Sequence, residues 1–138
     1  MVDTKRQWLT RKKRYIERTN KYYKNGLRFL NENEVEKASE MLWGSAAQAV
    51  KAVAAERGRE LRAHHLLSKF VRELSKESQE PELANEFDAI QGLHSNFYES
   101  ELTIEDVAAR VETVKKFVIR MLSFAEGLAP EVRKRIRP

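Results

Sequence analysis

An alanine-rich stretch near the middle of the chain constrains the fold more than any other feature. Seven of the eighteen residues from Ala38 to Ala55 are alanine. Alanine has the highest helix propensity, and its small side chain lets a neighbouring helix approach closely. A helix with so little bulk suits the middle of a bundle, where larger residues on its neighbours fill the space. Gly58 then supplies the left-handed residue that commonly ends a helix.

The N-terminal part of the chain repeats adjacent apolar pairs at seven-residue intervals. These pairs are Trp8-Leu9, Tyr15-Ile16, Tyr22-Tyr23 and Phe29-Leu30. Seven residues make about two helical turns, so the pairs share one stripe of a long amphipathic helix over about residues 4–31. Gly26 lies inside this helix, costs roughly 1 kcal/mol relative to alanine, and would mark a kink or an early end.

Apolar residues at spacings of three and four predict four more helices. They span about residues 34–57, 62–78, 82–97 and 103–127. No strand pattern, linker or low-complexity tract interrupts the sequence. The prediction is a single all-α domain over residues 1–138, an antiparallel four- to five-helix up-and-down bundle.

Polar residues mark several helix ends. Asn33 with Glu36 predicts a capping box at the second helix, and Thr103 with Asp106 predicts one at the last helix. Pro81 ends the third helix, since proline cannot continue a helix and disfavours helical geometry in the residue before it.

Positive charge is concentrated at the two ends of the chain. The whole chain carries +5, but residues 1–28 hold ten Lys/Arg against two acidic residues, a local charge of +8. Within the basic tail over 131–138, the last six residues (133–138) add four more Lys/Arg, which leaves −7 for residues 29–132. This asymmetry favours an anionic partner. The candidate nucleic-acid contacts on the first helix are Arg11, Lys12, Arg14, Arg18 and Lys21.

The basic face of the first helix also has a simpler interpretation, as the solvated back of an amphipathic helix. Clustered Lys/Arg attract phosphates whatever the nucleic-acid sequence. Trp8, Tyr15 and Tyr22 would offer stacking surfaces for bases if they are not buried. A membrane-surface helix is disfavoured because the apolar stripe is needed to cover the alanine helix.

Composition and missing motifs exclude several kinds of function. The absence of cysteine excludes disulfides and thiolate metal sites and agrees with a reducing compartment. No apolar run approaches the roughly 18 residues that span a bilayer, and the N-terminus lacks a secretory signal. A phosphate loop, a nucleophile elbow, paired catalytic carboxylates and metal-ligand spacings are also absent. We therefore expect a cytoplasmic protein with no cofactor, no metal and no membrane partner.

The three histidines each have a structural interpretation. His64 would pin the turn before the third helix, His65 would lie on the surface, and His94 would be a core histidine on the apolar face of the fourth helix. Asn96 and Tyr98 would either line a pocket at the end of the bundle or serve a structural role.

Three segments carry a resemblance to a known family. ASEMLWGSAAQAVKAVAAERG, then HHLLSKFV, then LHSNFYE resemble the archaeal PaREP-type family, which in turn is similar to the HEPN (higher eukaryotes and prokaryotes nucleotide-binding) domains. The resemblance covers about residues 27–125. It implies a four- or five-helix bundle, frequently a homodimer, with nucleotide or RNA binding. It also implies metal-independent RNA cleavage in some members and a nucleotidyltransferase partner in others.

Catalytic HEPN members carry an arginine, four to six residues, and then a histidine late in the bundle. Histidine can move protons near neutral pH, and arginine can stabilise the charge that develops on a phosphorane. The positions that would pair with His94 are Phe87, Asp88 and Ala89, so the motif fails there. The spacing does occur between Arg57 or Arg59 and His64, and between Arg59 and His65, but fourteen arginines make chance matches expected.

Two hypotheses follow from these observations. The favoured one is a non-enzymatic, HEPN-like binding module, a homodimer that contacts RNA, a nucleotide or an acidic protein partner through its basic first helix. The alternative is a metal-independent ribonuclease or toxin, whose catalytic candidates are Arg59, His64 and His94.

Overall fold

The fold is built from five α-helices. The structure, a computed structural model, describes residues 2–99 and 102–126, and the side chains of 2–95 and 102–126. The helices are α1 (Lys5–Asn31), α2 (Val35–Glu56), α3 (His64–Ser78), α4 (Glu82–Glu99) and α5 (Ile104–Ala125). Within these residues there is no strand, so the predicted all-α bundle is confirmed. None of the described helices combines the length and the apolar character needed to cross a membrane.

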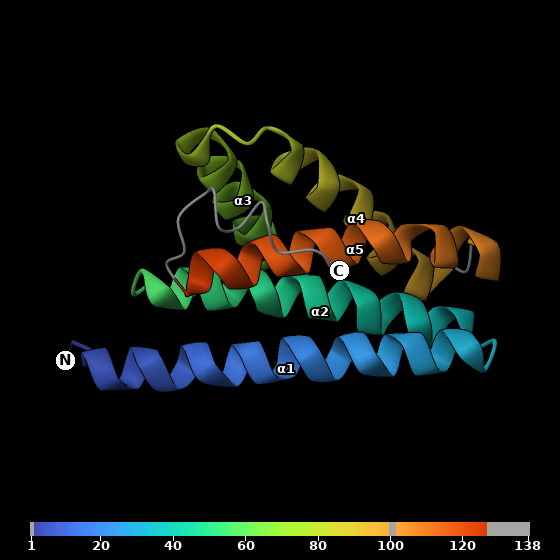
Figure 1. Cartoon of the computed structure of the whole chain (residues 1–138), viewed down its shortest axis with the longest axis horizontal. Coiled ribbons are helices and arrows are strands. Elements are labelled where there is room, and N and C mark those ends of the chain that lie inside the picture. Colours follow the sequence, from blue (N-terminus) through green and yellow to red (C-terminus); the bar gives the residue numbers. More distant parts are fainter. Residues whose placement is uncertain (1, 100–101, 127–138) are drawn as a thin grey trace.

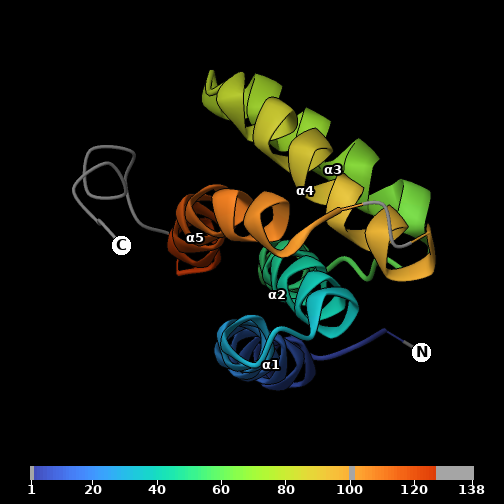
Figure 2. The same cartoon turned by 90° about the vertical axis from the view of Figure 1, so that its right-hand side faces the viewer.

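The five helices form two layers that cross. α1, α2 and α5 lie side by side with α2 between the other two, and the α3–α4 pair lies across them (Figures 1 and 2). α2 and α5 run in the same direction, opposite to α1 (Figure 1). The bundle therefore departs from strict up-and-down topology, because the crossing pair returns the chain to the end of the molecule where α2 begins.

The alanine helix is the centre of the molecule, as predicted. α2 packs against all four other helices. Thirteen of its 22 residues are buried, including all seven alanines from Ala38 to Ala55. The bulk is supplied from other helices, by large buried side chains that include Phe70, Phe87 and Phe117. Small side chains on one helix and large ones on its neighbours give the close packing of a protein interior.

Gly26 does not kink or end α1, contrary to the expectation from its helix propensity. The helix continues to Asn31, and Gly26 is buried against α2. A Cβ on Gly26 would lie 2.9 Å from Cδ2 and Cγ of Leu42, and Ser45 Oγ donates a hydrogen bond of 2.8 Å to Thr19 O across the same interface. The glycine is thus needed for the close approach of two helices.

The predicted cap at the start of α2 is wrong. Asn33 adopts a left-handed conformation with φ 61°, and Glu34, whose side chain makes no capping hydrogen bond, precedes the helix. Asparagine tolerates this conformation better than most residues, and it ends the tight α1–α2 turn. The left-handed Gly58 and the capping box of Thr103 and Asp106 are confirmed.

One further helix start differs from the sequence prediction, and one further cap was not predicted. α3 begins at His64 rather than near residue 62, with the extended Ala63 before it. At the start of α1, the Thr4 hydroxyl accepts from Gln7 N while the Gln7 side chain accepts from Thr4 N. This capping box follows the recognised spacing of threonine and glutamine, and the sequence prediction missed it.

Candidate functional site

Helix α1 carries a series of exposed cations, most of them on the side turned away from α2. The helix turns its apolar stripe toward α2, and Glu17 is its one acidic residue. Within the part of the chain that the structure describes, none of the exposed cations on this helix forms an ion pair. These cations, which we call the α1 basic face, are Lys5, Arg6, Lys13, Arg14, Arg18, Lys21, Lys24 and Arg28.

Two of the five predicted nucleic-acid contacts, Arg11 and Lys12, form ion pairs within the fold. Arg11 Nη1 lies 2.9 Å from Asp3 Oδ2, and its guanidinium stacks over the Trp8 ring at 4.5 Å. The hydrogen bond from Arg11 to Asp3 raises the pKa of the arginine further above its usual value. Lys12 Nζ is half-buried, 2.9 Å from Glu56 Oε1 and 3.2 Å from Ala125 O, so it ties α1 to the ends of α2 and α5. Arg14, Arg18 and Lys21 remain exposed.

Three rings from α2, α3 and α4 meet on the opposite side of α2. Trp43 lies 4.9 Å from His64 and 5.1 Å from His94, measured between ring centroids, and the two histidine rings lie 5.2 Å apart. His94 Nδ1 faces Glu40 Oε2 at 3.3 Å. We call these four residues the histidine cluster. The two histidines are thirty residues apart in the chain and meet only through the packing of α3 and α4 on α2.

Geometry limits the chemistry of the histidine cluster. Trp43 is 5% exposed, so it serves as a buried platform, while His64 is exposed and His94 half-buried. His64 and His94 are stacked, with 28° between their planes. Two imidazoles that flank a scissile phosphate need a gap for that phosphate, and rings in contact leave none. His65 lies on the surface, as predicted.

The arginines with the correct spacing to His64 do not face it. Arg59 Nη1 lies 3.2 Å from Glu73 Oε2, and its guanidinium covers the Phe70 ring at 5.0 Å. Arg57 Nη1 lies 2.7 Å from Glu77 Oε2. Both arginines therefore fasten the α2–α3 turn to α3, and the pairing of Arg59 with His64 is not formed.

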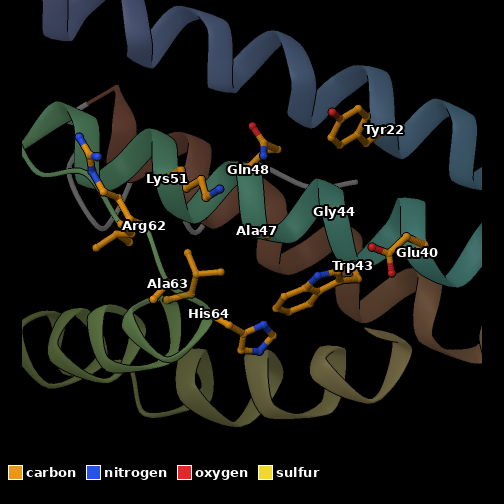
Figure 3. A pocket seen from close by; sticks show the side chains of 12 residues that line it. Tyr22, Glu40, Trp43, Gly44, Ala47, Gln48, Lys51, Arg62, Ala63 and His64 are labelled. Carbon is orange, nitrogen blue, oxygen red and sulfur yellow. The ribbon is translucent and has the colours of Figure 1, made fainter. Parts of the chain in front are cut away.

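A hollow of about 340 Å³ opens beside His64, between α1, α2 and the segment that leads into α3. Its floor is made by the small residues Gly44 and Ala47 of α2 (Figure 3). We call it the α1–α2 hollow. The polar and aromatic side chains that line it are Tyr22, Glu40, Trp43, Gln48, Lys51, Arg62 and His64.

Gln48 carries an unusual polar atom in this region. Its Oε1 is buried and has no hydrogen-bond partner among the described residues. Figure 3 shows the carboxamide between Tyr22 and Lys51, at the wall of the α1–α2 hollow. Buried polar atoms are almost always hydrogen-bonded in proteins, so Gln48 Oε1 is an exception among the described residues.

An ion pair fastens α4, which carries His94, to α5. Arg120 Nη1 lies 3.0 Å from Glu86 Oε1 and 3.8 Å from Glu82 Oε1. Burial raises the pKa of the Glu86 carboxyl, and the nearby Arg120 lowers it by less. The arrangement holds the position of α4.

Metal binding has no support in the described residues, among which no group of three or more His, Cys, Asp or Glu is arranged to hold an ion. The side chains of the pocket candidates Asn96 and Tyr98 lie outside the described residues, as does the basic tail over 131–138.

The sequence interpretation missed four residues that matter here. Trp43 and Glu40 complete the histidine cluster, and Lys51 and Arg62 line the α1–α2 hollow. One signal was present, since Trp43 is the sole aromatic residue in the alanine helix. The other three are ordinary charged residues in the sequence, and only the packing of the helices shows where they point.

Comparison with known proteins identifies the family. The family model described as the archaeal PaREP1/PaREP8 family matches residues 14–118, which is most of the chain. No curated protein and no solved structure shows a significant match. The matched region takes in most of α1, all of α2, α3 and α4, and most of α5. The chain therefore belongs to the archaeal PaREP1/PaREP8 family.

Proposed function

We propose that this protein is a non-enzymatic binding module that holds RNA on the α1 basic face. The observation that carries the proposal is the row of eight exposed cations that form no ion pair within the described residues. Phosphate groups are the partners that such a row attracts, and most of the affinity of a protein for nucleic acid comes from these contacts. The proposed ligand is therefore a polyanion.

The shape of the basic face favours a polymer over a single nucleotide. α1 has 27 residues and is about 40 Å long, so its cations can neutralise several successive phosphates. A mononucleotide or a small anion would contact few of them. An acidic protein segment is the competing ligand, and absence of RNA binding at low salt would favour it.

Other arginines show what a fold-stabilising cation looks like in this molecule. Arg57, Arg59 and Arg120 each lie within 3.2 Å of a glutamate oxygen on a neighbouring helix. The α1 basic face has no such role, since removing its charges would break no ion pair among the described residues. It is thus free to bind a partner.

The test measures binding of a labelled RNA at several salt concentrations. The variant Arg14→Gln/Arg18→Gln/Lys21→Gln should weaken binding and reduce the slope of log K against log salt by about 2, since each lost phosphate contact removes about 0.7 for a single strand. The matched control is Lys69→Gln/Arg72→Gln/Lys76→Gln, which removes the same charge from exposed positions on α3. Equal losses in both variants, or no binding by the unmodified protein at low salt, would refute the proposal.

A ribonuclease is the second candidate, because the histidine cluster brings His64 and His94 together beside Glu40. A carboxylate next to one ring nitrogen orients an imidazole as a general base. Two observations argue against a ribonuclease: the rings of His64 and His94 are in contact, and no arginine has the required spacing to His94. Incubation of labelled RNA with the protein, without metal, decides between the two functions. A ribonuclease cleaves the RNA and loses this activity in His64→Ala or His94→Ala. A binding module leaves the RNA intact, both as the unmodified protein and as either variant.

Homodimerisation, a nucleotidyltransferase partner and the relation to HEPN domains stay predictions from the family resemblance, and the cytoplasmic location stays a prediction from composition. Leu9 and Leu27, 53% and 38% exposed, lie along one flank of α1 and are the apolar residues that a second copy would cover. A sedimentation mass near 16.1 kDa would contradict the dimer.

A further inference from the structure

The α1–α2 hollow lies beside the α1 basic face, next to Tyr22. Arg14, Arg18 and Tyr22 follow one another at intervals of four residues, so they lie on one slanting stripe of α1. Arg14 and Arg18 are exposed, and Tyr22 is the residue of α1 that lines the hollow. A strand that follows the two arginines is led to the mouth of the hollow.

The walls of the hollow suit a flat group. Tyr22 lies along one side, and a Cβ on Gly44 would be 3.2 Å from Tyr22 Cδ2, which places the phenol ring directly over the floor. His64, stacked on Trp43, lies on the far side of the hollow (Figure 3). A volume of about 340 Å³ is at the lower end of the range for small-ligand sites and suits a single base.

The polar groups of the hollow suit a base that is attached to a phosphate. Lys51 and Arg62 line it. Lys51 forms no ion pair among the described residues, and Arg62 Nη2 lies 3.0 Å from Oε2 of the neighbouring Glu60 at an exposed position. The one carboxylate of the hollow, Glu40, is eleven residues from Lys51 on α2, about 16 Å along the helix axis. The side chain of Gln48 also lines the hollow, beside Lys51 (Figure 3).

We propose that the α1–α2 hollow receives one unpaired base of an RNA strand whose phosphates lie on Arg14 and Arg18. This inference rests on the proposed RNA-binding function and adds a selectivity to it. A base in a duplex is stacked and paired, so it is not available to enter a hollow, whereas the bases of a single strand can be splayed out and stacked on aromatic side chains. The protein then prefers single-stranded RNA to duplex RNA.

Tryptophan fluorescence gives a direct readout of the hollow. The chain has two tryptophans, so Trp8→Phe leaves Trp43, which lines the hollow, as the one emitter. The probes are a ten-nucleotide oligouridylate and a blunt ten-base-pair RNA duplex. Oligouridylate should change the Trp43 emission. It should bind to the protein with Tyr22 about tenfold more tightly than to the Tyr22→Leu variant, which lacks the stacking ring. The duplex should leave the emission unchanged.

Two further variants distinguish the loss of a binding contact from the loss of folding. Tyr22→Phe keeps the ring and should keep the affinity for the single strand. Arg62→Gln alters a side chain that is 82% exposed and cannot disturb the core, yet it should weaken single-strand binding severalfold and leave duplex binding within twofold.

The outcomes separate this inference from the proposed function. Equal affinity for single strand and duplex, with constant Trp43 emission and with both affinities lowered by the Arg14/Arg18/Lys21 variant, would overturn the base site and leave the RNA-binding function standing. Absence of binding to either RNA at low salt would overturn both.

Discussion

The α1 basic face and the histidine cluster lie on different sides of α2 and are built in opposite ways. The basic face belongs to one helix, and its cations face solvent without ion pairs among the described residues. The histidine cluster draws Glu40 and Trp43 from α2, His64 from α3 and His94 from α4. Charge changes on the basic face should alter binding and spare the fold, whereas loss of the buried Trp43 should lower the stability of the fold.

The largest effect on stability is expected from Trp43→Ala. The indole is 5% exposed and contacts His64, Phe87 and His94, so its loss leaves a cavity where three helices meet. The free energy of unfolding, measured by urea denaturation with circular dichroism, should fall by about 3–5 kcal/mol.

The control for Trp43→Ala is the triple glutamine variant of Arg14, Arg18 and Lys21. It should change the free energy of unfolding by no more than about 0.5 kcal/mol, as surface substitutions usually do. Similar losses of stability in the two proteins would remove the contrast between the two regions.

A smaller effect on stability is expected from Gly26→Ala, which tests how closely α1 packs against α2. The new methyl group would meet Leu42, which is fully buried and cannot yield. Overpacking costs about 1–3 kcal/mol, and alanine returns about 1 kcal/mol through helix propensity, so unfolding should become easier by up to about 2 kcal/mol.

Gly92→Ala provides the matched comparison for Gly26→Ala. Gly92 lies on α4, is exposed, and a Cβ there would meet nothing within 4 Å. The substitution should stabilise the protein by about 0.5–1 kcal/mol. A gain in thermal midpoint for both variants would show that α1 and α2 do not need the close approach.

A smaller effect again is expected within the histidine cluster. Glu40 and His94 have side chains that are 30% and 29% exposed, and their 3.3 Å contact is long. A double-mutant cycle with Glu40→Gln and His94→Gln should give a coupling of about 0.2–1 kcal/mol. A coupling near zero would show that the contact between Glu40 and His94 does not stabilise the fold.

The smallest effect is expected at the start of α5. Hydrogen bonding to Thr103, first through its backbone N–H and then through its side chain, holds the pKa of Asp106 below its usual value, so the charged carboxylate stabilises the folded state. For a depressed pKa this stabilisation is present above the pKa of the unfolded chain and is lost as pH falls through the lower pKa of the folded state. The difference in stability between the unmodified protein and Asp106→Ala should therefore shrink in acid, in urea titrations from pH 6 to pH 2. A difference that stays constant would exclude the carboxylate as the cap.

Local and periodic features of the structure could be predicted from the sequence, whereas the contacts between distant side chains could not. The buried alanines, the left-handed Gly58 and the cap of Thr103 are local or periodic features, and they were predicted correctly. Asn33 was assigned to the wrong role because asparagine suits both a cap and a left-handed turn. The Arg59–His64 pairing failed because spacing along the chain does not say which way a guanidinium turns, and here it turns to Glu73.

By itself the sequence determined that α1 is long and basic on one side and that a slender alanine helix occupies the middle, because helical periodicity converts residue order directly into faces. Only the tertiary structure decided that α3 and α4 cross the other helices, that His64 meets His94 on Trp43, and that Lys51 and Arg62 line a hollow beside Tyr22. These contacts join residues far apart in the chain. The crossing of packed helices, which no local pattern encodes, sets which of their side chains meet.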